Sequence, residues 1–240
     1  MAMFDTKRFI RASVEAGREL LRLAPRSINT AAVERVFPAL VPIRSLGSNH
    51  RTRIAHHLLA LEPEDRYLRF GHWASDDQIF RYVAALDFER DEVFGIYNRK
   101  LDLIAFAHLA YAKDSRFDSC AEFGVSVLAG ARGRGYGARL FARAAMHATN
   151  DGVSLMFIHA LSENAAMLKI ARSAGASVER DGTESEAYLR LPPPSLDTRV
   201  TELIEENVAQ VDYRLKAQAK NFWEFLAGLQ EIRRSVNSVD

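Results

Sequence analysis

Residues 124–146 read GVSVLAGARGRGYGARLFARAAM, and this stretch decides the fold. Its beginning alternates as a β-strand does, its middle carries alternate glycines, and its end has the apolar spacing of an amphipathic helix. Backbone N–H groups at the start of a helix bind anions, and glycines leave the approach to them open. Four arginines lie on or near the turn, Arg132, Arg134, Arg139 and Arg143, and of these Arg132 and Arg134 add positive charge to the loop. The stretch therefore predicts an anion-binding loop between a strand and a helix, with a phosphate ester as ligand.

Two common nucleotide-binding motifs do not fit this loop. A P-loop ends in Gly-Lys-Ser or Gly-Lys-Thr, whereas this loop ends in Gly-Ala-Arg at residues 137–139. The dinucleotide fingerprint is G-x-G-x-x-G, whereas Gly133, Gly135 and Gly137 are spaced G-x-G-x-G. For the glycines taken alone, a tight turn with solvated arginines remains the alternative.

The composition is that of a globular protein without a global charge bias. The 240 residues are 48% hydrophobic and 26% charged, and the net charge of +1 excludes a global attraction to nucleic acid or membrane. The single cysteine, Cys120, excludes an intrachain disulfide and a cysteine-rich metal site, and we expect no metal. Charged residues occupy the N-terminus where a signal peptide is apolar, so the sequence predicts a cytoplasmic protein.

The chain divides into three zones. Residues 1–38 have the apolar spacing of a helical segment, residues 39–191 mix strand and helix patterns, and residues 192–240 follow the proline-rich LPPPS. The mixed order in the middle zone predicts an α+β domain. Its expected strands cover 40–46, 91–98, 101–112, 119–130, 153–161 and a hairpin over 177–191, and its expected helices cover 50–61, 78–86, 136–148 and 164–174.

The last zone predicts a long helix. Residues 196–236 contain no proline and one glycine, and their apolar residues recur in steps of three and four. One continuous amphipathic helix and a helical hairpin both fit this pattern. The apolar stripe is too long for one small domain to cover, so we expect a homodimer through this helix. The alternative is a stripe that folds back on the N-terminal helix of the same chain.

A larger constellation surrounds the glycine loop. R-x-x-G-x-G, formed by Arg132, Gly135 and Gly137, follows a hydrophobic strand and opens a helix; the next strand leads to Asn164, and Gly175 follows eleven residues later. This arrangement resembles the GNAT superfamily of acyl-CoA-dependent N-acetyltransferases over about residues 40–191. The resemblance implies a mixed, mostly antiparallel sheet flanked by helices, and acetyl-CoA as co-substrate.

Three stretches are similar to one branch of that superfamily. RYLRF at 66–70, AEFGVSV at 121–127 and NAAMLKIARSAGA at 164–176 resemble the acetyltransferase domain of bacterial Pat-type protein-lysine acetyltransferases. Those proteins usually carry an acyl-CoA-synthetase-like or cyclic-nucleotide-binding region, and nothing in this sequence fits one. The resemblance therefore implies acetyl transfer to a primary amine, either a protein lysine or a small molecule, without naming the acceptor.

The resemblance also assigns cofactor residues. It implies that the loop amides bind the pyrophosphate of coenzyme A, that the preceding strand pairs with the pantetheine arm, and that the asparagine hydrogen-bonds that arm. The residues assigned in this way are Val125, Ser126, Val127, Arg132, Gly133, Arg134, Gly135, Tyr136, Gly137 and Asn164. Direct attack in a ternary complex would form a tetrahedral oxyanion, and we expect a backbone N–H group of the strand, that of Val127, to stabilise it.

Amide formation needs an uncharged amine, so a group must accept the proton of the ammonium. Glu122 is the one carboxylate in the strand before the loop, and strand alternation places it on the face of Gly124 and Ser126. We expect it to be the general base; a solvated surface carboxylate is the alternative. His56 and His57 are expected on a helix surface, and both His108 and His159 in the core.

One departure from the family bears on the mechanism. Many GNAT enzymes have a tyrosine that protonates the leaving thiolate seven residues after the asparagine, where this chain has Ala171. Tyr111 and Tyr188 are possible substitutes. The same departure keeps open a non-catalytic acyl-CoA-binding sensor. A third possibility is a helical assembly module in which residues 196–240 carry the function.

Overall fold

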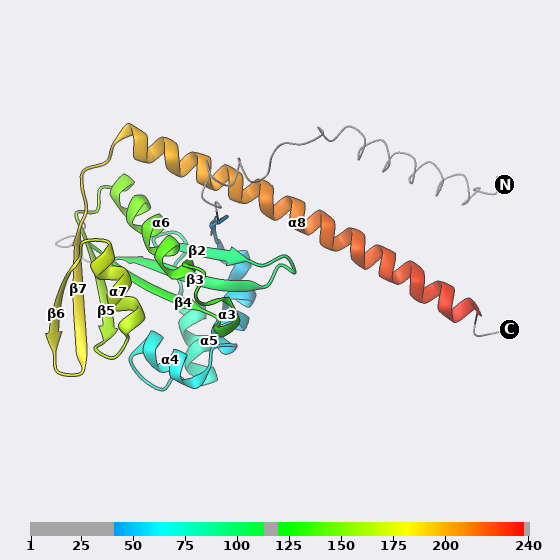
Figure 1. Cartoon of the computed structure of the whole chain (residues 1–240), viewed down its shortest axis with the longest axis horizontal. Helices are drawn as coiled ribbons and strands as arrows, with labels where there is room; N and C mark the ends of the chain where they lie inside the picture. Colours follow the sequence, from blue (N-terminus) through cyan, green and yellow to red (C-terminus); the bar gives the residue numbers. More distant parts are fainter. Residues whose placement is uncertain (1–40, 113–119, 238–240) are drawn as a thin grey trace. The chain divides into compact units, whose positions relative to one another are not determined.

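The computed structural model describes residues 41–112 and 120–237, all within one compact unit that spans residues 41–240. The predicted helical segment of residues 1–38 lies outside the described residues. In the described part, a seven-stranded sheet has the order β1-β2-β3-β4-β5-β7-β6 (Figure 1). Its strands are β1 (Arg44–Ser45), β2 (Glu92–Tyr97), β3 (Leu103–Tyr111), β4 (Cys120–Val127), β5 (Leu155–Leu161), β6 (Ser177–Asp181) and β7 (Glu184–Arg190).

The sheet is mixed and mostly antiparallel, as the sequence predicts. Every pair of neighbouring strands is antiparallel except β4 and β5, which run parallel. Parallel neighbours need a crossover connection, and helix α6 (Tyr136–Asn150) supplies it. The β4–β5 pairing covers three positions, Cys120 with Leu155, Ala121 with Met156 and Glu122 with Phe157, and the strands do not pair beyond these.

Helices cover both faces of the sheet. On one face, α3 (Arg51–Leu59) and α5 (Asp76–Ala85) pack with Val93, Leu103 and Phe106 of the strands. On the other face, α6 and α7 (Ala165–Ser173) pack with strand residues that include Phe94, Leu109 and Phe123. Successive residues of a strand point to opposite faces, which is why β3 contributes Phe106 to one layer and Leu109 to the other.

The element bounds differ from the sequence prediction at three places. Helix α4 (Pro63–Phe70) was not predicted; proline occupies its first turn, and Gly71 ends it with φ +75°. Helix α5 begins at Asp76, two residues before the predicted 78–86, and is capped by Ser75, whose Oγ accepts a hydrogen bond from the Gln78 backbone N–H group. The first strand is shorter than the predicted 40–46, because only Arg44–Ser45 pairs with β2.

The chain ends in one continuous helix of 42 residues, α8 (Leu196–Asn237), and not in a hairpin. One face of α8 contacts the domain through Thr198, Glu202, Glu206, Ala209, Tyr213 and Lys216. Its other side exposes large apolar side chains, namely Leu196, Val200, Leu203, Ile204, Val208, Val211 and Leu215. None of the helices in the described ranges is long and apolar enough to cross a membrane.

A buried arginine organises the contact between α6 and α8. Arg143, which the sequence places near the loop, instead points at α8, and its side chain is 3% exposed. Its guanidinium lies 3.4 Å from Glu202, 3.9 Å from Glu205 and 3.3 Å from Glu206. Arg143 therefore belongs to the contact between α6 and α8 and not to the glycine loop.

His147 extends this ionic cluster by one helical turn. Its Nδ1 lies 2.5 Å from Glu202, and its Nε2 lies 3.8 Å from Glu92. Burial alone would lower the pKa of His147, but the hydrogen bond to Glu202 and the charge of Glu92 outweigh it and raise that pKa. Burial alone would raise the pKa of Glu202, but hydrogen bonds from His147 and Asn150 lower it overall. Both groups are thus stabilised in their charged forms.

Candidate active site

The glycine loop leaves the start of helix α6 open. Gly133 and Gly135 have φ +74° and +75°, the left-handed conformation that glycine adopts without strain. Gly135 is the N-cap of α6, no side chain caps the helix, and its first turn has no acidic residue. A Cβ atom at Gly133 or Gly135 would meet nothing within 4 Å. The first N–H groups of α6 therefore face open space, as an anion site requires.

A large cavity joins this loop to the sheet. Its volume is about 780 Å³, and residues of α4, β4, the loop, β5 and α7 line it. Of the residues that the sequence assigns to cofactor and catalysis, all but Arg134 line this cavity: Glu122, Val125, Ser126, Val127, Arg132, Gly133, Gly135, Tyr136, Gly137 and Asn164. Arg134 is exposed and lies outside the lining.

The cavity continues into the separation between β4 and β5. Beyond the pair Glu122–Phe157, the two strands no longer face each other in register, although β4 continues to Val127 and β5 to Leu161. Residues of both separated segments line the cavity, among them Val125 and Ile158. The backbone of an edge-like strand can pair with an extended ligand, so the separation offers a slot for one.

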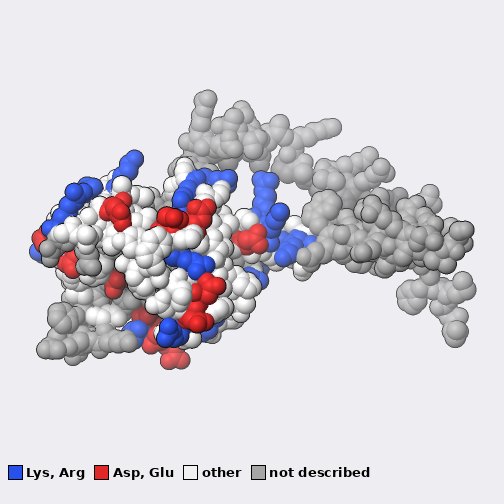
Figure 2. All heavy atoms as spheres, turned by 90° about the horizontal axis from the view of Figure 1, so that it is seen from below, with Lys and Arg blue, Asp and Glu red and all other residues white. Residues whose placement is uncertain are grey.

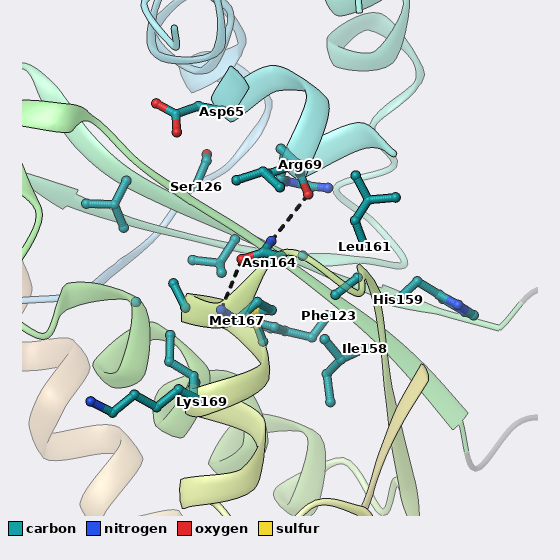
Figure 3. Close-up of a pocket in the computed structure, with 18 of the residues that line it drawn as sticks. Asp65, Arg69, Phe123, Ser126, Ile158, His159, Leu161, Asn164, Met167 and Lys169 are labelled. Carbon is teal, nitrogen blue, oxygen red and sulfur yellow. Dashed lines mark hydrogen bonds between the residues drawn. The ribbon is translucent and has the colours of Figure 1, made fainter. Parts of the chain in front are cut away.

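Asn164 stands where the slot meets α7. Its Oδ1 accepts a hydrogen bond from the Met167 amide at 3.1 Å, and its Nδ2 donates to the Leu68 carbonyl at 3.4 Å (Figure 3). The side chain thus caps α7 and ties it to α4 across the cavity. An amide group has further donor and acceptor capacity beyond these two bonds.

Arg132 is tied across the cavity mouth. Its guanidinium forms an ion pair with Asp65 of α4, and its Nε donates to the Val127 carbonyl at 3.4 Å. The ion pair links the glycine loop to the helix on the opposite side of the cavity. Its side chains are 47% and 17% exposed, so an incoming anion can compete for the guanidinium.

Glu122 lies at the edge of the cavity. It is exposed on β4, opposite Ala110 of β3 and Phe157 of β5. The pleat puts it on the face of Gly124 and Ser126, and all three line the cavity. A carboxylate at this place can reach a ligand in the cavity while keeping contact with water.

The tyrosines considered as proton donors are engaged elsewhere. Tyr111 donates to Asp151 at 2.7 Å, and it does not line the cavity. Tyr188 donates to Glu186, and that hydrogen bond raises its pKa to about 12. Tyr136 lines the cavity while it packs against the core, and Ala171 is completely buried.

Two expectations about histidines are wrong. His57 is buried and not on the surface: its Nδ1 lies 2.8 Å from the Leu103 carbonyl, and its Nε2 lies 2.8 Å from Ser126 Oγ. The carbonyl can only accept, so Nδ1 carries the hydrogen and the serine hydroxyl donates to Nε2. Burial lowers the pKa of His57 to about 4. His159, expected in the core, is exposed beside Glu186 and lines the cavity.

The helical spacing of α3 contained a signal for His57. It follows Ile54 by three residues and precedes Leu61 by four, and both of these are buried. His108 does lie in the interior, as expected, with its side chain 13% exposed. Among the residues that the structure describes, no group of His, Cys, Asp or Glu side chains is arranged to hold a metal ion.

The sequence matches one protein family. The model of the acetyltransferase (GNAT) family aligns with residues 54–176, just over half of the chain. The chain belongs to the GNAT acetyltransferase family. It is therefore an acyltransferase by family, and its slot and glycine loop belong to the region that this family model covers. No curated protein sequence matches this GNAT chain.

Solved structures share the fold at low sequence identity. The GNAT domain of S. lividans Pat is 19% identical over 62% of this chain and 89% of that structure, with a TM-score of 0.54. A GNAT-family acetyltransferase of Streptococcus pneumoniae is 10% identical over 62% and 98%, with a TM-score of 0.51. An N-acetyltransferase of Staphylococcus aureus is 14% identical over 62% and 98%, with a TM-score of 0.50. At these identities the likeness shows the fold.

Proposed function

We propose that this GNAT acetyltransferase moves the acetyl group of acetyl-CoA to a primary amine by direct attack in a ternary complex. The separation of β4 from β5, which opens toward the uncapped start of α6, carries the proposal. The pyrophosphate then lies on the amides of Gly133 to Gly137, with Arg132 and Arg134 adding positive charge. The pantetheine arm lies along Val125 to Val127, and Asn164 hydrogen-bonds it.

The chemistry needs few groups from the protein. Glu122 accepts the proton of the ammonium, directly or through water, and the free amine attacks the thioester carbonyl. A backbone N–H group of β4, that of Val127, stabilises the oxyanion. The C–S bond then breaks, sulfur keeps the electron pair, and the nitrogen loses its second proton to water to give the amide. A thiol with a pKa near 8.5 leaves as the thiolate without a positioned acid, which is consistent with buried Ala171.

Replacement of Glu122 by Gln tests the base. The change keeps the shape and removes the proton acceptor, so kcat is expected to fall by about a hundred- to ten-thousand-fold. Affinity for acetyl-CoA should change little, and the acid limb of the pH–rate profile should disappear. Glu186→Gln is the matched control, because this carboxylate lines the same cavity. Turnover of Glu122→Gln within a few-fold of wild type, with the acid limb intact, would place the base elsewhere.

Replacement of Gly135 by Asp tests the cofactor site. The carboxylate would enter the open approach to the amides and repel the pyrophosphate, so binding of coenzyme A should be lost. Gly152→Asp is a matched control, since Gly152 also has a positive φ (+81°), also has nothing within 4 Å, and lies outside the cavity lining. Calorimetry on the two folded variants separates backbone strain from repulsion. Unchanged affinity in Gly135→Asp refutes the assignment of the loop.

We also propose a homodimer through α8, with catalysis in residues 39–191 and assembly in residues 192–240. From Ile204 on, residues recur at alternating intervals of four and three, and nine of the ten positions are apolar: Ile204, Val208, Val211, Leu215, Gln218, Phe222, Phe225, Leu229, Ile232 and Val236. This is the heptad pattern of a two-stranded coiled coil, in which one polar position sets the register. The first four lie on the exposed side of α8, away from the domain contacts.

Sedimentation at micromolar concentration tests the dimer. The double variant Val208→Glu and Leu215→Glu places charges in the stripe and should give a monomer. Lys220→Gln, at an exposed position on the opposite side of α8 from the stripe, should leave the dimer unchanged. A monomeric mass for the wild-type chain refutes the proposal.

A further inference from the structure

Arg69 lies directly against the strand that borders the slot. Its guanidinium sits over Gly124 of β4, where an added Cβ atom would be 2.6 Å from the Arg69 Nη2 and 2.7 Å from its Cζ. No side chain larger than hydrogen leaves room for the group in this position. Both residues line the cavity. Because Gly124 has no side chain, the Arg69 guanidinium can lie at the cavity wall (Figure 3).

A chain of hydrogen bonds holds Arg69 in place. Its Nη2 donates to Tyr82 Oη at 3.0 Å, Tyr82 pairs with His108 Nδ1 at 2.9 Å, and His108 Nε2 lies 3.1 Å from Asp91. The carboxylate only accepts, so His108 donates from Nε2 and accepts the Tyr82 proton at Nδ1. Burial raises the pKa of Tyr82 and lowers that of His108, which favours the neutral form of both.

Asp91, at the far end of this series of hydrogen bonds, is negatively charged. Burial alone would raise the pKa of Asp91, but hydrogen bonds from Arg90 and His108 outweigh it and lower that pKa. Arg90 lies 2.7 Å from this carboxylate. Asp91 is thus paired with Arg90, and two neutral groups separate it from Arg69.

The guanidinium of Arg69 is short of partners. It has five N–H donors, and in the described residues one of them is used, by Tyr82. Its Nε is buried with no hydrogen-bond partner, and no described carboxylate lies within ion-pair distance of the group. Arg69 is half-buried, and its guanidinium contacts the rings of Phe70 and Tyr82 but no described carboxylate. An anion in the cavity would therefore find a cation with free donors to pair with.

An opposite charge stands beside it. Glu122 precedes Gly124 by two residues on the same face of β4, which separates the two positions by about 6.6 Å along the strand. Glu122 and Arg69 line one cavity without pairing with each other. A ligand between them that carries an ammonium and a carboxylate a few ångströms apart would meet both charges. The side chain of a lysine within a protein has no such carboxylate.

We propose that the acceptor is a small amine that carries its own carboxylate, as a free amino acid does, with the carboxylate on Arg69 and the amine facing Glu122. This inference rests on the proposed acetyl transfer and names its acceptor class. A planar guanidinium with free donors binds a carboxylate through two parallel hydrogen bonds. The α-carboxylate and α-amine of an amino acid are about 3 Å apart, which fits between neighbouring same-face positions.

Matched acceptors test this proposal. Coenzyme A release is measured with alanine, methionine and lysine, each compared with its α-amide, and with a peptide that has an internal lysine. The wild-type protein should favour each acid over its amide by at least about tenfold in kcat/KM. Arg69→Gln should bring that ratio close to one. Gly124→Ala should do the same, because its Cβ displaces the guanidinium. Arg81→Gln, at an exposed position of α5, should keep the wild-type ratio.

Three outcomes of the acceptor comparison overturn the proposal. The wild-type protein could use amides as well as acids, or prefer the peptide, or Arg69→Gln could weaken acetyl-CoA binding and leave the acid-to-amide ratio unchanged. Binding of the acceptor can be tested apart from acetyl transfer, by calorimetric titration of the amino acids into protein that is saturated with coenzyme A. If no acceptor releases coenzyme A, acetyl transfer fails, while binding that needs the carboxylate and Arg69 still supports the site. Absence of such binding overturns it.

Discussion

Replacement of Arg143 by Met should weaken the attachment of α8 to the domain. Met has a similar length and can keep the contact with Phe94, whose ring lies 5.5 Å from the guanidinium carbon. It leaves Glu202, Glu205 and Glu206 without the cation that they share, within one and a half turns of α8. Their mutual repulsion then opposes docking of the helix.

The size of the effect follows from burial. Loss of one partner from a fully buried ion pair costs about 3–5 kcal/mol, and an exposed pair contributes about 0–1 kcal/mol. Arg143 is 3% exposed, but its three partners are 18–31% exposed, so solvent screens part of the charge. We expect a loss of about 2–3 kcal/mol in the free energy of unfolding, between the two limits.

Urea unfolding and hydrogen exchange measure this prediction. A variant with Glu202, Glu205 and Glu206 all changed to Gln completes a double-mutant cycle with Arg143→Met. The coupling energy from that cycle should account for most of the loss in the free energy of unfolding. Amide exchange should accelerate in residues 196–216 of α8 more than in β3. Arg214→Met, at an exposed position of α8, controls for the loss of a positive charge. A loss below about 0.5 kcal/mol with unchanged exchange in α8 would show that apolar packing, not this cluster, holds the helix.

Three further predictions concern buried groups. The pKa of His147 is raised by folding, so its protonated form stabilises the folded state fully below the unfolded pKa of 6.5, and this stabilisation is lost as pH rises through the folded pKa. In His147→Gln, the urea concentration at half-unfolding should no longer fall over that pH range. The pKa of His57 is lowered to about 4, so stability should fall as pH drops from 6.5 toward 4, by at most about 3 kcal/mol, and His57→Gln should flatten that slope in urea titrations. Gly95→Ala would put a Cβ 2.6 Å from Leu103 and 2.8 Å from Leu46, and thermal unfolding should report about 1–3 kcal/mol of overpacking.

The repeating patterns of the chain predict its regular elements well. Alternation in FGVSV and apolar spacing after Tyr136 depend on neighbouring residues, so β4 and α6 lie where the sequence puts them. Helix α4 has eight residues, four of them charged, and none of its residues is buried, so it has no apolar stripe to detect. The glycine loop could be predicted from the sequence because the conformational freedom of glycine is a property of the residue itself.

The polar contacts of the interior could not be predicted in the same way. His57 meets Ser126 at a separation of 69 residues, and Arg143 meets Glu202 and Glu206 at 59 and 63. No local spacing encodes such partners, because the fold brings them together. Gly124 is similar: its sequence context suggests a strand, and only the position of Arg69 shows why that strand needs a glycine.

One face of the domain carries charges of both signs. On the face seen in Figure 2, the acidic and basic side chains are interspersed over the described part, without a field of one sign. This agrees with the net charge of +1 and with ligand recognition inside a cavity rather than over an open surface.

The short pairing of β4 with β5 also has a consequence for the lifetime of the folded chain. Strands β1–β4 and β5–β7 are joined in the sheet by three residue pairs, so the two halves depend on the shared apolar layer and α6 for their cohesion. An extended ligand in the slot would bridge them with hydrogen bonds that the chain itself does not make. A ligand at a hundred times its Kd raises the free energy of unfolding by about 2.7 kcal/mol. Bound acetyl-CoA would then lower the population of the opened form, which is the form that proteases cleave.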